Sequence, residues 1–506
     1  MKNLLKLSLA LALTSALFTQ AAHSQIKPIY QVQFYSPGVK GPPPVISFLD
    51  AAATVTLSTL NFPNTQAGTT SAPLTMTLKN TGTAPVVFGA TPLTVYAPYT
   101  LVAGSTCTGT LAVNATCTAS FTFSPPAVGT FNGKYLALAS TPTPRVVIPF
   151  YATAPSPIVE VVSGGASYST IVKRQDGTWW GTGSNSNGEL GLGSTTAYYY
   201  SYVPLPALAG AVKVYTNGGS TFAIMGDGSV KASGGNKGNL GLGDMVNRTV
   251  FTTVTGITAQ KIVLGFGSAT YLQKLDGTWW GAAQNASGEL GLGDTAPRTT
   301  FVPLALPANT VSLVAGYANT FVQNATGNWF AVGENYYGQL GIGDRTNRST
   351  FTSMPIPAGS TIVPSYFDTF VRYSNSSWAE AGWNLYVVND NGIGSYINPS
   401  FVGVSSLNGA VSLAAGVQTF FARFPDNSVK GAGWDYGGGV GGGYSTQQLT
   451  FFTPPGVAGT TTVSPSLGGT VGLMPDGTLV VTGYNKNLGI GISDSSIRYR
   501  FFQTIQ

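Results

Sequence analysis

Carboxylates are the side chains in this sequence that could carry general acid–base chemistry. The only histidine is His23, so the rest of the chain lacks the imidazole of Ser–His–Asp and Cys–His nucleophile activation and of histidine-containing zinc sites. A carboxylate-dependent enzyme acting on polysaccharides needs two acids at a set separation. We therefore expect no catalytic residues, and a glycan-active enzyme is the less favoured alternative. The acids available for it, which the sequence cannot pair in space, are Glu189, Glu289, Glu334, Asp368, Glu380 and Asp435.

Metal and cofactor sites are also not expected. Asp244, Asp294 and Asp344 each follow a glycine-rich segment. A calcium site would need several carboxylates from one loop, whereas each of these stands alone, so a turn or capping role is predicted. The glycine-rich segments lack the Lys-Ser/Thr and the following helix of a phosphate-binding loop.

Aromatic residues outside the repeated motifs are the candidates for contacts with a partner. Tyr and Trp are enriched where proteins bind one another, and a cluster of them on one rim would form an exposed apolar patch. Core packing or scattered exposure is the alternative for each residue. The candidates are Tyr317, Tyr336, Tyr337, Phe367, Trp383, Tyr386, Trp434, Tyr436 and Tyr484.

A fifty-residue repeat must position these side chains. The motif G-x-L-G-L/I-G occurs at 188–193, 238–243, 288–293 and 338–343, with degenerate copies near 392, 438 and 489. Seven units of this length fill 157–506, and a fixed period of this size indicates a solenoid or propeller. Four short strands with their turns fit fifty residues, and ring closure removes exposed sheet edges.

The motifs have local structural explanations. Asp-Gly pairs such as Asp176-Gly177 predict a hairpin turn of type I′, with positive φ at both central residues. Trp179 and Trp180 follow this turn and should point to opposite faces of the sheet, so one of them should pack between blades. The motif leucines can be buried between blades, and the motif glycines allow close backbone approach.

Three repeated elements carry a resemblance to a known family. They are V-x-x-V/A-A-G, as in Val311 to Gly316, then D-G-T-x-W and G-x-L-G-L/I-G. Together they resemble the regulator-of-chromosome-condensation repeat family over 157–506. The resemblance implies a seven-bladed propeller, with both termini in one closing blade and partner binding through variable rim loops. The histidine that often follows the first element is missing, and units five to seven are eroded, so the geometry of unit five is left open.

Residues 51–155 have a different pattern. Alternating apolar runs with turn signals about every ten residues predict an all-β sandwich. The Asn80-Thr81-Gly82 turn and the pair Cys107 and Cys117 make the segment similar to the immunoglobulin-like domain of the Hydin and choice-of-anchor class, which implies a spacer or attachment module. In an exported chain this cysteine pair predicts one disulfide, with two free thiols as the alternative.

The N-terminus predicts export. Lys2 and Lys6 precede and flank an apolar run, Leu7 to Phe18, and Ala22-His23-Ser24 offers a cleavage site, so 1–24 are predicted to be a signal peptide. The run is shorter than the ~20 residues that span a bilayer, so no stable membrane span is expected, and an uncleaved anchor is the alternative.

The sequence therefore predicts an all-β protein: an immunoglobulin-like β-sandwich followed by a seven-bladed β-propeller. Residues 25–50 are predicted to be a linker. The net charge is +6 with no basic run, so nucleic-acid binding is not expected. We expect a secreted or cell-surface protein, with the periplasm as the alternative location, that binds an extracellular protein or glycan partner through rim loops. A structural, display or adhesion role in the cell envelope is the alternative function.

Overall fold

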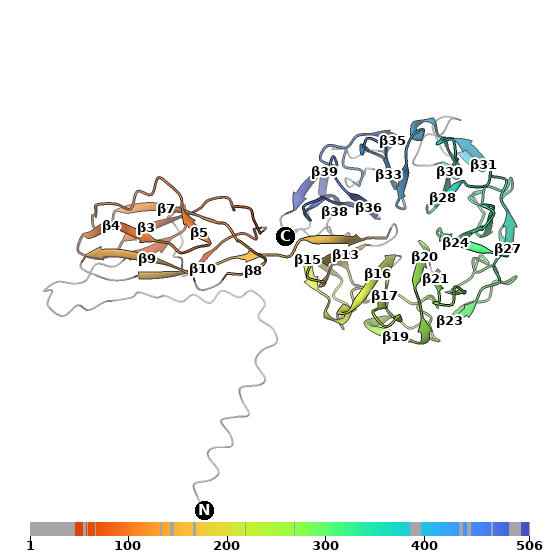
Figure 1. Cartoon of the computed structure of the whole chain (residues 1–506), viewed down its shortest axis with the longest axis horizontal. Helices are drawn as coiled ribbons and strands as arrows, with labels where there is room; N and C mark the ends of the chain where they lie inside the picture. The colour runs from red at the N-terminus through yellow and green to blue at the C-terminus, as the bar shows by residue number, and fades with distance from the viewer. Residues whose placement is uncertain are drawn as a thin grey trace, which may run out of the picture. The chain divides into compact units, whose positions relative to one another are not determined.

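The computed structural model describes residues 46–504 except 54–56, 58, 66, 132–133, 142–145, 165–167, 218, 268, 385–395, 435–438, 443–446, 467–468 and 485–496. The chain divides into two compact units, Met1–Pro155 and Ser156–Gln506. The described residues form β-strands and two short 3-10 helices, which confirms the predicted all-β class (Figure 1). None of the described helices is long and apolar enough to cross a membrane. The predicted signal peptide lies outside the described residues.

The first unit is a sandwich of two sheets. In the described residues, the first sheet has the strand order β1(Ile46–Leu49), β3(Leu74–Asn80), β7(Thr116–Phe123), β5(Tyr99–Leu101). The second has the order β2(Leu60–Asn61), β10(Val146–Tyr151), β9(Lys134–Thr141), β4(Val86–Thr94), β6(Thr110–Leu111), and β8(Gly129–Thr130) pairs with β11(Thr153–Ala154). Strand β7 alternates between buried and more exposed residues, and Phe121 and Phe123 are among its buried ones. Their rings join a core that also contains Tyr99 and Phe150.

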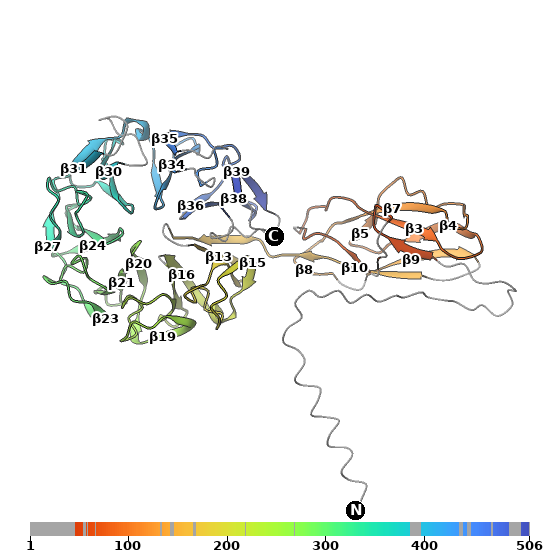
Figure 2. The same ribbon diagram turned by 180° about the vertical axis from the view of Figure 1, so that it is seen from behind.

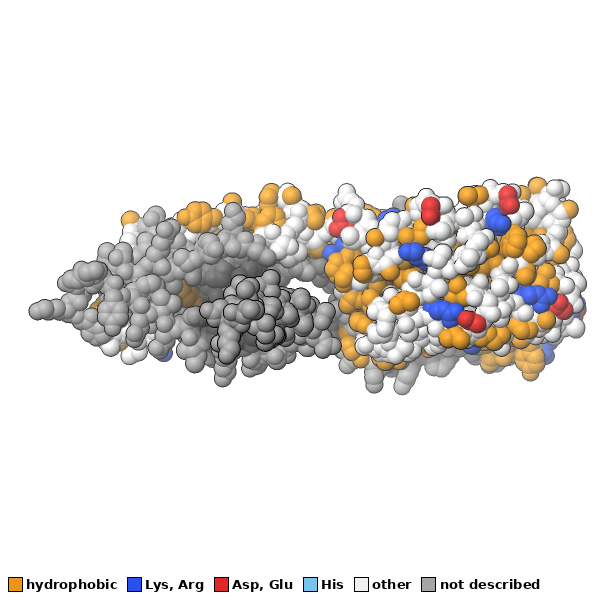
Figure 3. Space-filling model, turned by 90° about the horizontal axis from the view of Figure 1, so that it is seen from below, with side chains coloured by type: hydrophobic (Ala, Val, Ile, Leu, Met, Phe, Trp, Pro, Cys, Tyr) orange, Lys and Arg blue, Asp and Glu red, His pale blue; other side chains and the backbone are white. Residues whose placement is uncertain are grey.

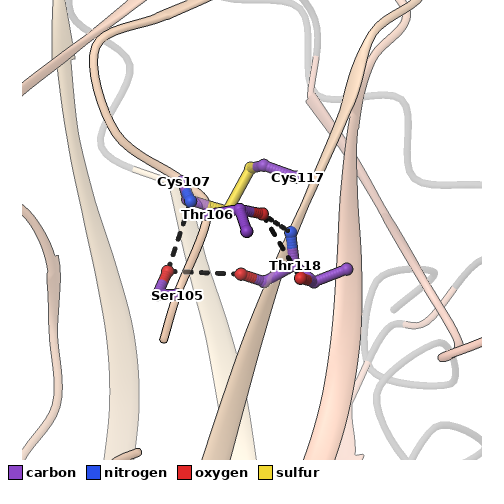
Figure 4. The surroundings of a disulfide bond; sticks show 5 residues. All are labelled: Ser105, Thr106, Cys107, Cys117 and Thr118. Atoms are coloured by element: carbon purple, nitrogen blue, oxygen red, sulfur yellow. Dashed lines mark hydrogen bonds between the residues drawn. A yellow bond between two sulfur atoms is a disulfide. The ribbon is translucent and has the colours of Figure 1, made fainter. Parts of the chain in front are cut away.

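Cys107 and Cys117 form the predicted disulfide, which is buried in the sandwich (Figure 4). Two hydrogen bonds next to the disulfide hold the same two segments together. The Thr118 amide donates to Thr106 Oγ1 over 2.8 Å, and the Ser105 hydroxyl donates to the Thr118 carbonyl over 3.2 Å. The disulfide therefore ties β7 to the segment that precedes β6.

Within the described part of Ser156–Gln506, the second unit is a seven-bladed propeller (Figures 1 and 2). Each blade is an antiparallel sheet of four consecutive strands. The first four blades are β12(Ile158–Val162), β13(Ser169–Arg174), β14(Trp179–Ser184), β15(Tyr198–Pro204); β16(Ala211–Asn217), β17(Ser220–Met225), β18(Ser229–Gly234), β19(Arg248–Thr258); β20(Lys261–Leu264), β21(Ala269–Gln273), β22(Trp279–Ala283), β23(Arg298–Pro303); and β24(Thr310–Ala315), β25(Asn319–Asn324), β26(Trp329–Gly333), β27(Arg348–Ser353). The last three are β28(Thr361–Pro364), β29(Asp368–Arg372), β30(Trp378–Asn384), β31(Tyr396–Gly403); β32(Ser412–Ala415), β33(Thr419–Arg423), β34(Val429–Trp434), β35(Gln447–Phe452); and β36(Thr462–Ser466), β37(Gly469–Leu473), β38(Leu479–Tyr484), β39(Ile497–Thr504). Helices η1(Pro206–Leu208) and η2(Ser405–Leu407) follow β15 and β31. Blade five, whose geometry the sequence left open, is a complete sheet.

The ring closes in a different way from the one that the family resemblance implies. No described blade combines strands from both ends of the propeller, because β39 already completes blade seven. Instead, β12 contacts β36 and β37, and the Ile158 amide donates to the Gly477 carbonyl over 3.3 Å. Ile158 and Val172 of blade one share an apolar cluster with Val471 and Leu479 of blade seven. The closing seam is therefore built from side-chain packing and a backbone hydrogen bond rather than from a shared sheet.

Tryptophans join several of the blades to their neighbours. Trp179 packs in the cluster between blades one and two, and its indole N–H donates to the Ala211 carbonyl of β16 over 3.3 Å. Trp180 packs against the cluster between blades seven and one. The two side chains point to opposite faces, as predicted, but both pack between blades rather than one. Trp329 makes the equivalent hydrogen bond toward blade five: its indole N–H donates to the Ser360 carbonyl over 2.8 Å.

The fourth motif residue, a glycine, is required by close approach between blades. Gly291 has φ +71°, and a Cβ there would lie 2.4 Å from the Phe351 ring on the outer strand of the next blade. Gly191 meets Phe251 in the same way, at 2.3 Å. The first leucine of the motif is buried, as predicted, and Leu290 has no exposed surface; the second aliphatic position, such as Leu292, is half-buried at the edge of the same cluster. The G-x-L-G-L/I-G motif thus allows one blade to pack closely on the next.

The Asp-Gly turns are not of type I′. Only the glycine has a positive φ, which is +82° at Gly177, and the Gly177 amide donates to the Arg174 carbonyl. This is a three-residue loop that ends in a left-handed glycine. The Asp176 carboxylate accepts hydrogen bonds from the Thr178 amide and hydroxyl at 2.9 and 2.7 Å, which stabilises the loop.

Replacing Gly291 with Ala should destabilise the propeller by about 2–4 kcal/mol, because the substitution adds a clash with Phe351 to the strain of a positive φ. Gly277→Ala is the matched control: φ is +85° there, but nothing lies within 4 Å of the added Cβ, so about 1 kcal/mol is expected. Chemical denaturation of the two variants measures the difference. Equal losses would show that the contact between blades is not what requires the glycine.

Candidate binding surface

One face of the propeller carries the loops in which the described candidate aromatic residues lie. Successive strands in a blade run in opposite directions, so the loop after the first strand and the loop after the third strand lie on the same face. The Asp-Gly turns, after the second strand, lie on the other. Tyr317 follows β24 and Tyr336 follows β26 in blade four, while Phe367 follows β28 and Trp383 is near the end of β30 in blade five.

Six aromatic side chains meet on this face at the seam between blades four and five. Tyr337 stacks on Trp383 with ring centroids 5.0 Å apart, and it contacts Phe367 edge-on at 5.5 Å. Phe367 also contacts Trp383 at 5.3 Å. The Tyr366 ring contacts both Phe367 and Tyr317, with ring centroids 4.5 and 4.0 Å apart, respectively. We call the following set the aromatic surface: Tyr317, Tyr336, Tyr337, Tyr366, Phe367 and Trp383.

The aromatic surface reaches solvent. Tyr336 is 60% exposed and lies perpendicular to Tyr337, with ring centroids 4.9 Å apart. The other five side chains are half-buried. A patch with one projecting ring and a half-buried apolar floor has the anatomy of a binding surface, in which aromatic anchors sit among packed neighbours.

The structure brings together part of the set that the sequence proposed. Tyr317, Tyr336, Tyr337, Phe367 and Trp383 meet in the aromatic surface. Tyr386 and Tyr436 lie outside the described residues, and only the backbone of Trp434 and Tyr484 is described.

Tyr366 was missed by the sequence analysis, although it is the repeat equivalent of Tyr317. Both residues lie two positions before the first residue of the second strand, Asn319 in blade four and Asp368 in blade five. The spacing between the two tyrosines is one residue short of the period, which hid the match. Allowing a one-residue shift in the repeat would have found it.

Two carboxyl groups lie beside the aromatic residues, inside blade five. Asp368 pairs with Gly382 across β29 and β30, and Phe370 pairs with Glu380, so both acids are on the same face of the sheet. Their side chains interact and are 3% and 1% exposed. Burial and the nearby Glu380 raise the pKa of Asp368 well above its usual range, and burial raises the pKa of Glu380 to about 8.

Blade five differs from its neighbours at this position. The residue equivalent to Glu380 is Gly181 in blade one and Ala331 in blade four. In blade one, an added Cβ on Gly181 would lie 2.9 Å from the motif leucine, Leu190. The motif of blade five is degenerate, and a glutamate occupies the place where blades one and four have a small residue.

The remaining acids have structural surroundings. Glu189 and Glu289 are buried in the motif loops, where their carboxylates accept hydrogen bonds from the Asn187 and Ser287 amides. Asp244, Asp294 and Asp344 each cap a turn and pair with an arginine four residues later. Burial raises the pKa of half-buried Glu334. Asp435 lies outside the described residues.

The arrangement suits binding better than catalysis. A carboxyl with a raised pKa can act as a general acid only where substrate can reach it, and Asp368 and Glu380 are enclosed by the blade. A cavity of about 290 Å³ lies elsewhere, between blades six and seven, where Leu413, Arg423 and Val463 contribute to its lining.

Comparisons with known proteins identify the propeller type. No family model matches the sequence, and no curated protein matches it. Yeast RCC1 (Prp20), solved bound to Kap60, is 14% identical, with 61% of this chain and 78% of that chain covered and a TM-score of 0.52. Human WBSCR16 is 15% identical, with 64% and 92% covered and a TM-score of 0.56. These likenesses establish an RCC1-like propeller fold. The immunoglobulin-like assignment of the sandwich remains a prediction.

Glu380→Gln should flatten the pH dependence of stability. An unfolded glutamate releases its proton near its ordinary pKa, whereas folded Glu380 keeps its proton until about pH 8. Between these values the unfolded state binds fewer protons, so the free energy of unfolding falls as pH rises, by about 1.4 kcal/mol per pH unit for one proton. The amide removes this contribution.

Denaturant unfolding at several pH values between 5 and 8 measures this slope. Asp276→Asn is the control, because this carboxylate is exposed in a turn and its pKa is lowered, so the slope above pH 5 should match that of the wild type. A wild-type slope retained in Glu380→Gln would contradict the assignment.

Proposed function

We propose that this chain is an exported, non-catalytic binding protein whose propeller holds an extracellular protein partner on the aromatic surface. The observation that carries the proposal is the set of six aromatic side chains across the seam between blades four and five. Half-buried tyrosine and tryptophan present large contact areas with few rotatable bonds, which is what partner anchors require.

The repeat supports the proposal as an internal comparison. Tyr336 and Tyr337 lie between Asn335 and Gly338, the first glycine of the motif. The same places hold Ala286 and Ser287 in blade three. Trp383 corresponds to an exposed Gln284. A blade folds with small or polar residues at these positions, so the aromatic side chains serve a purpose other than completing the blade.

The structural neighbours support a protein as the partner class. Prp20p from Saccharomyces cerevisiae, which is 15% identical over 60% of this chain and 79% of that chain with a TM-score of 0.52, was studied for its binding to Gsp1p and histones. That statement concerns Prp20p alone. It indicates that a propeller of this type can serve as a platform for proteins.

Export and attachment complete the proposal. The basic and apolar N-terminal segment has the features of a signal peptide of 1–24, and the Cys107–Cys117 disulfide is typical of oxidising compartments. The sandwich, 51–155, would then act as a spacer or attachment module that presents the propeller, 157–506. A role in surface display is compatible with the same arrangement.

Substituting Tyr337 and Trp383 with Ala together should reduce capture of the partner at least tenfold, about 1.4 kcal/mol, because both stacked rings are removed. Immobilised full-length wild type and variant are incubated with medium and cell-surface extract from the native source, and captured proteins are quantified by mass spectrometry. The matched control is Gln284→Ala with Ser287→Ala, at the equivalent positions of blade three. Circular dichroism checks that every variant is folded. Identical capture by all three proteins would refute the proposal.

A further inference from the structure

We propose that Arg345, seated on Tyr336, binds a carboxylate group of the protein partner. This inference rests on the proposed function and specifies the chemistry of the same site. The partner would present an aspartate or glutamate beside an apolar side chain, with the carboxylate on Arg345 and the apolar group on the aromatic surface.

The position of Arg345 is set by Tyr336. Its Nε–H donates to the Tyr336 carbonyl over 2.7 Å, and its guanidinium carbon lies 5.2 Å from the centre of the Tyr336 ring. Both residues are exposed. A guanidinium that is held in this way has already lost much of its conformational freedom, so binding a partner requires less ordering.

The two terminal nitrogens of Arg345 remain for a partner. Within the described residues, no aspartate or glutamate oxygen lies within 4.0 Å of this guanidinium. A planar guanidinium binds a carboxylate through two parallel N–H···O bonds, and the neighbouring aromatic rings would exclude water from that pair. A carboxylate therefore matches both the charge and the geometry of the site.

The other arginines of these loops have a different role. Arg248 pairs with Asp244 at 2.6 Å, Arg298 with Asp294 at 2.7 Å, and Arg348 pairs with Asp344 in the same way. Figure 3 shows blue and red groups lying side by side at several places on the propeller, among hydrophobic and uncharged side chains. Each of these arginines completes its own loop and is not available to a carboxylate from outside.

Arg345 is an addition to this scheme. The residue after the loop aspartate is Met245 in blade two and Thr295 in blade three. Asp344 does not neutralise Arg345, because its carboxylate accepts hydrogen bonds from Arg348 and from the Thr346 amide. Blade four thus adds a cation at the edge of the aromatic surface, next to the one ring that projects into solvent.

The acids near the aromatic surface are shifted toward their neutral forms, which weakens their interaction with this charge. Burial raises the pKa of Glu334 and of both Asp368 and Glu380, which favours their neutral forms. The site therefore combines one exposed cation with apolar rings. An acidic side chain with an apolar neighbour is its complement.

Selection from a phage-displayed library of random peptides on the immobilised full-length protein tests the inference. We expect the enriched peptides to carry Asp or Glu next to an aromatic or aliphatic residue. Binding should weaken at least tenfold on Arg345→Ala, and less on Arg345→Lys, which keeps the charge but loses the two-pronged geometry. Replacing the peptide's acid with its amide should cause a similar loss. Thr295→Ala, the equivalent position in blade three, should leave binding unchanged.

The outcomes separate the two proposals. Peptides that need Tyr337 and Trp383 but lack an acidic residue, or that bind Arg345→Ala with unchanged affinity, would overturn the carboxylate site and leave the proposed function standing. A selection that yields no peptide dependent on Arg345 or on the aromatic surface would count against both.

Discussion

Close contact between successive blades is the constraint on which the rest of the propeller depends. Each motif loop places a left-handed glycine against a phenylalanine of the next blade, so that a single added carbon at Gly291 would come within 2.4 Å of the Phe351 ring. Tryptophan indoles donate across the same seams. Because every blade is held by its neighbours, the loops on one face can change without disturbing the strands beneath them.

The propeller could be predicted from the sequence because the same contact recurs every fifty residues and therefore demands the same residue types. The way in which the ring closes could not, since it depends on whether β39 completes the last blade or joins the first one. The pairing of Asp368 with Glu380 depends on the register of β29 and β30, which no motif encodes. Tyr366 escaped detection because one residue is missing from the period between it and Tyr317.

Blade five departs from the repeat in its sequence but not in the arrangement of its strands. It is a complete four-stranded sheet although its motif is degenerate. It contains two buried acids where other blades have small or uncharged residues, and it supplies Tyr366, Phe367 and Trp383 to the aromatic surface. Buried carboxyls with raised pKa values reduce the stability of a fold at neutral pH. Local rules of stability are commonly broken near functional sites, and here the departure adjoins the proposed binding surface.

Construction of every blade from consecutive strands has an evolutionary consequence. No propeller sheet in the described residues depends on distant parts of the chain, so a gene segment that encodes one fifty-residue unit is also a complete structural unit. Duplication or loss of such a segment would add or remove a whole blade and leave every other sheet intact. The position of the termini is equally arbitrary: a circularly permuted chain that opens at another seam would contain the same seven sheets. Propellers whose first and last strands share a blade lack this freedom.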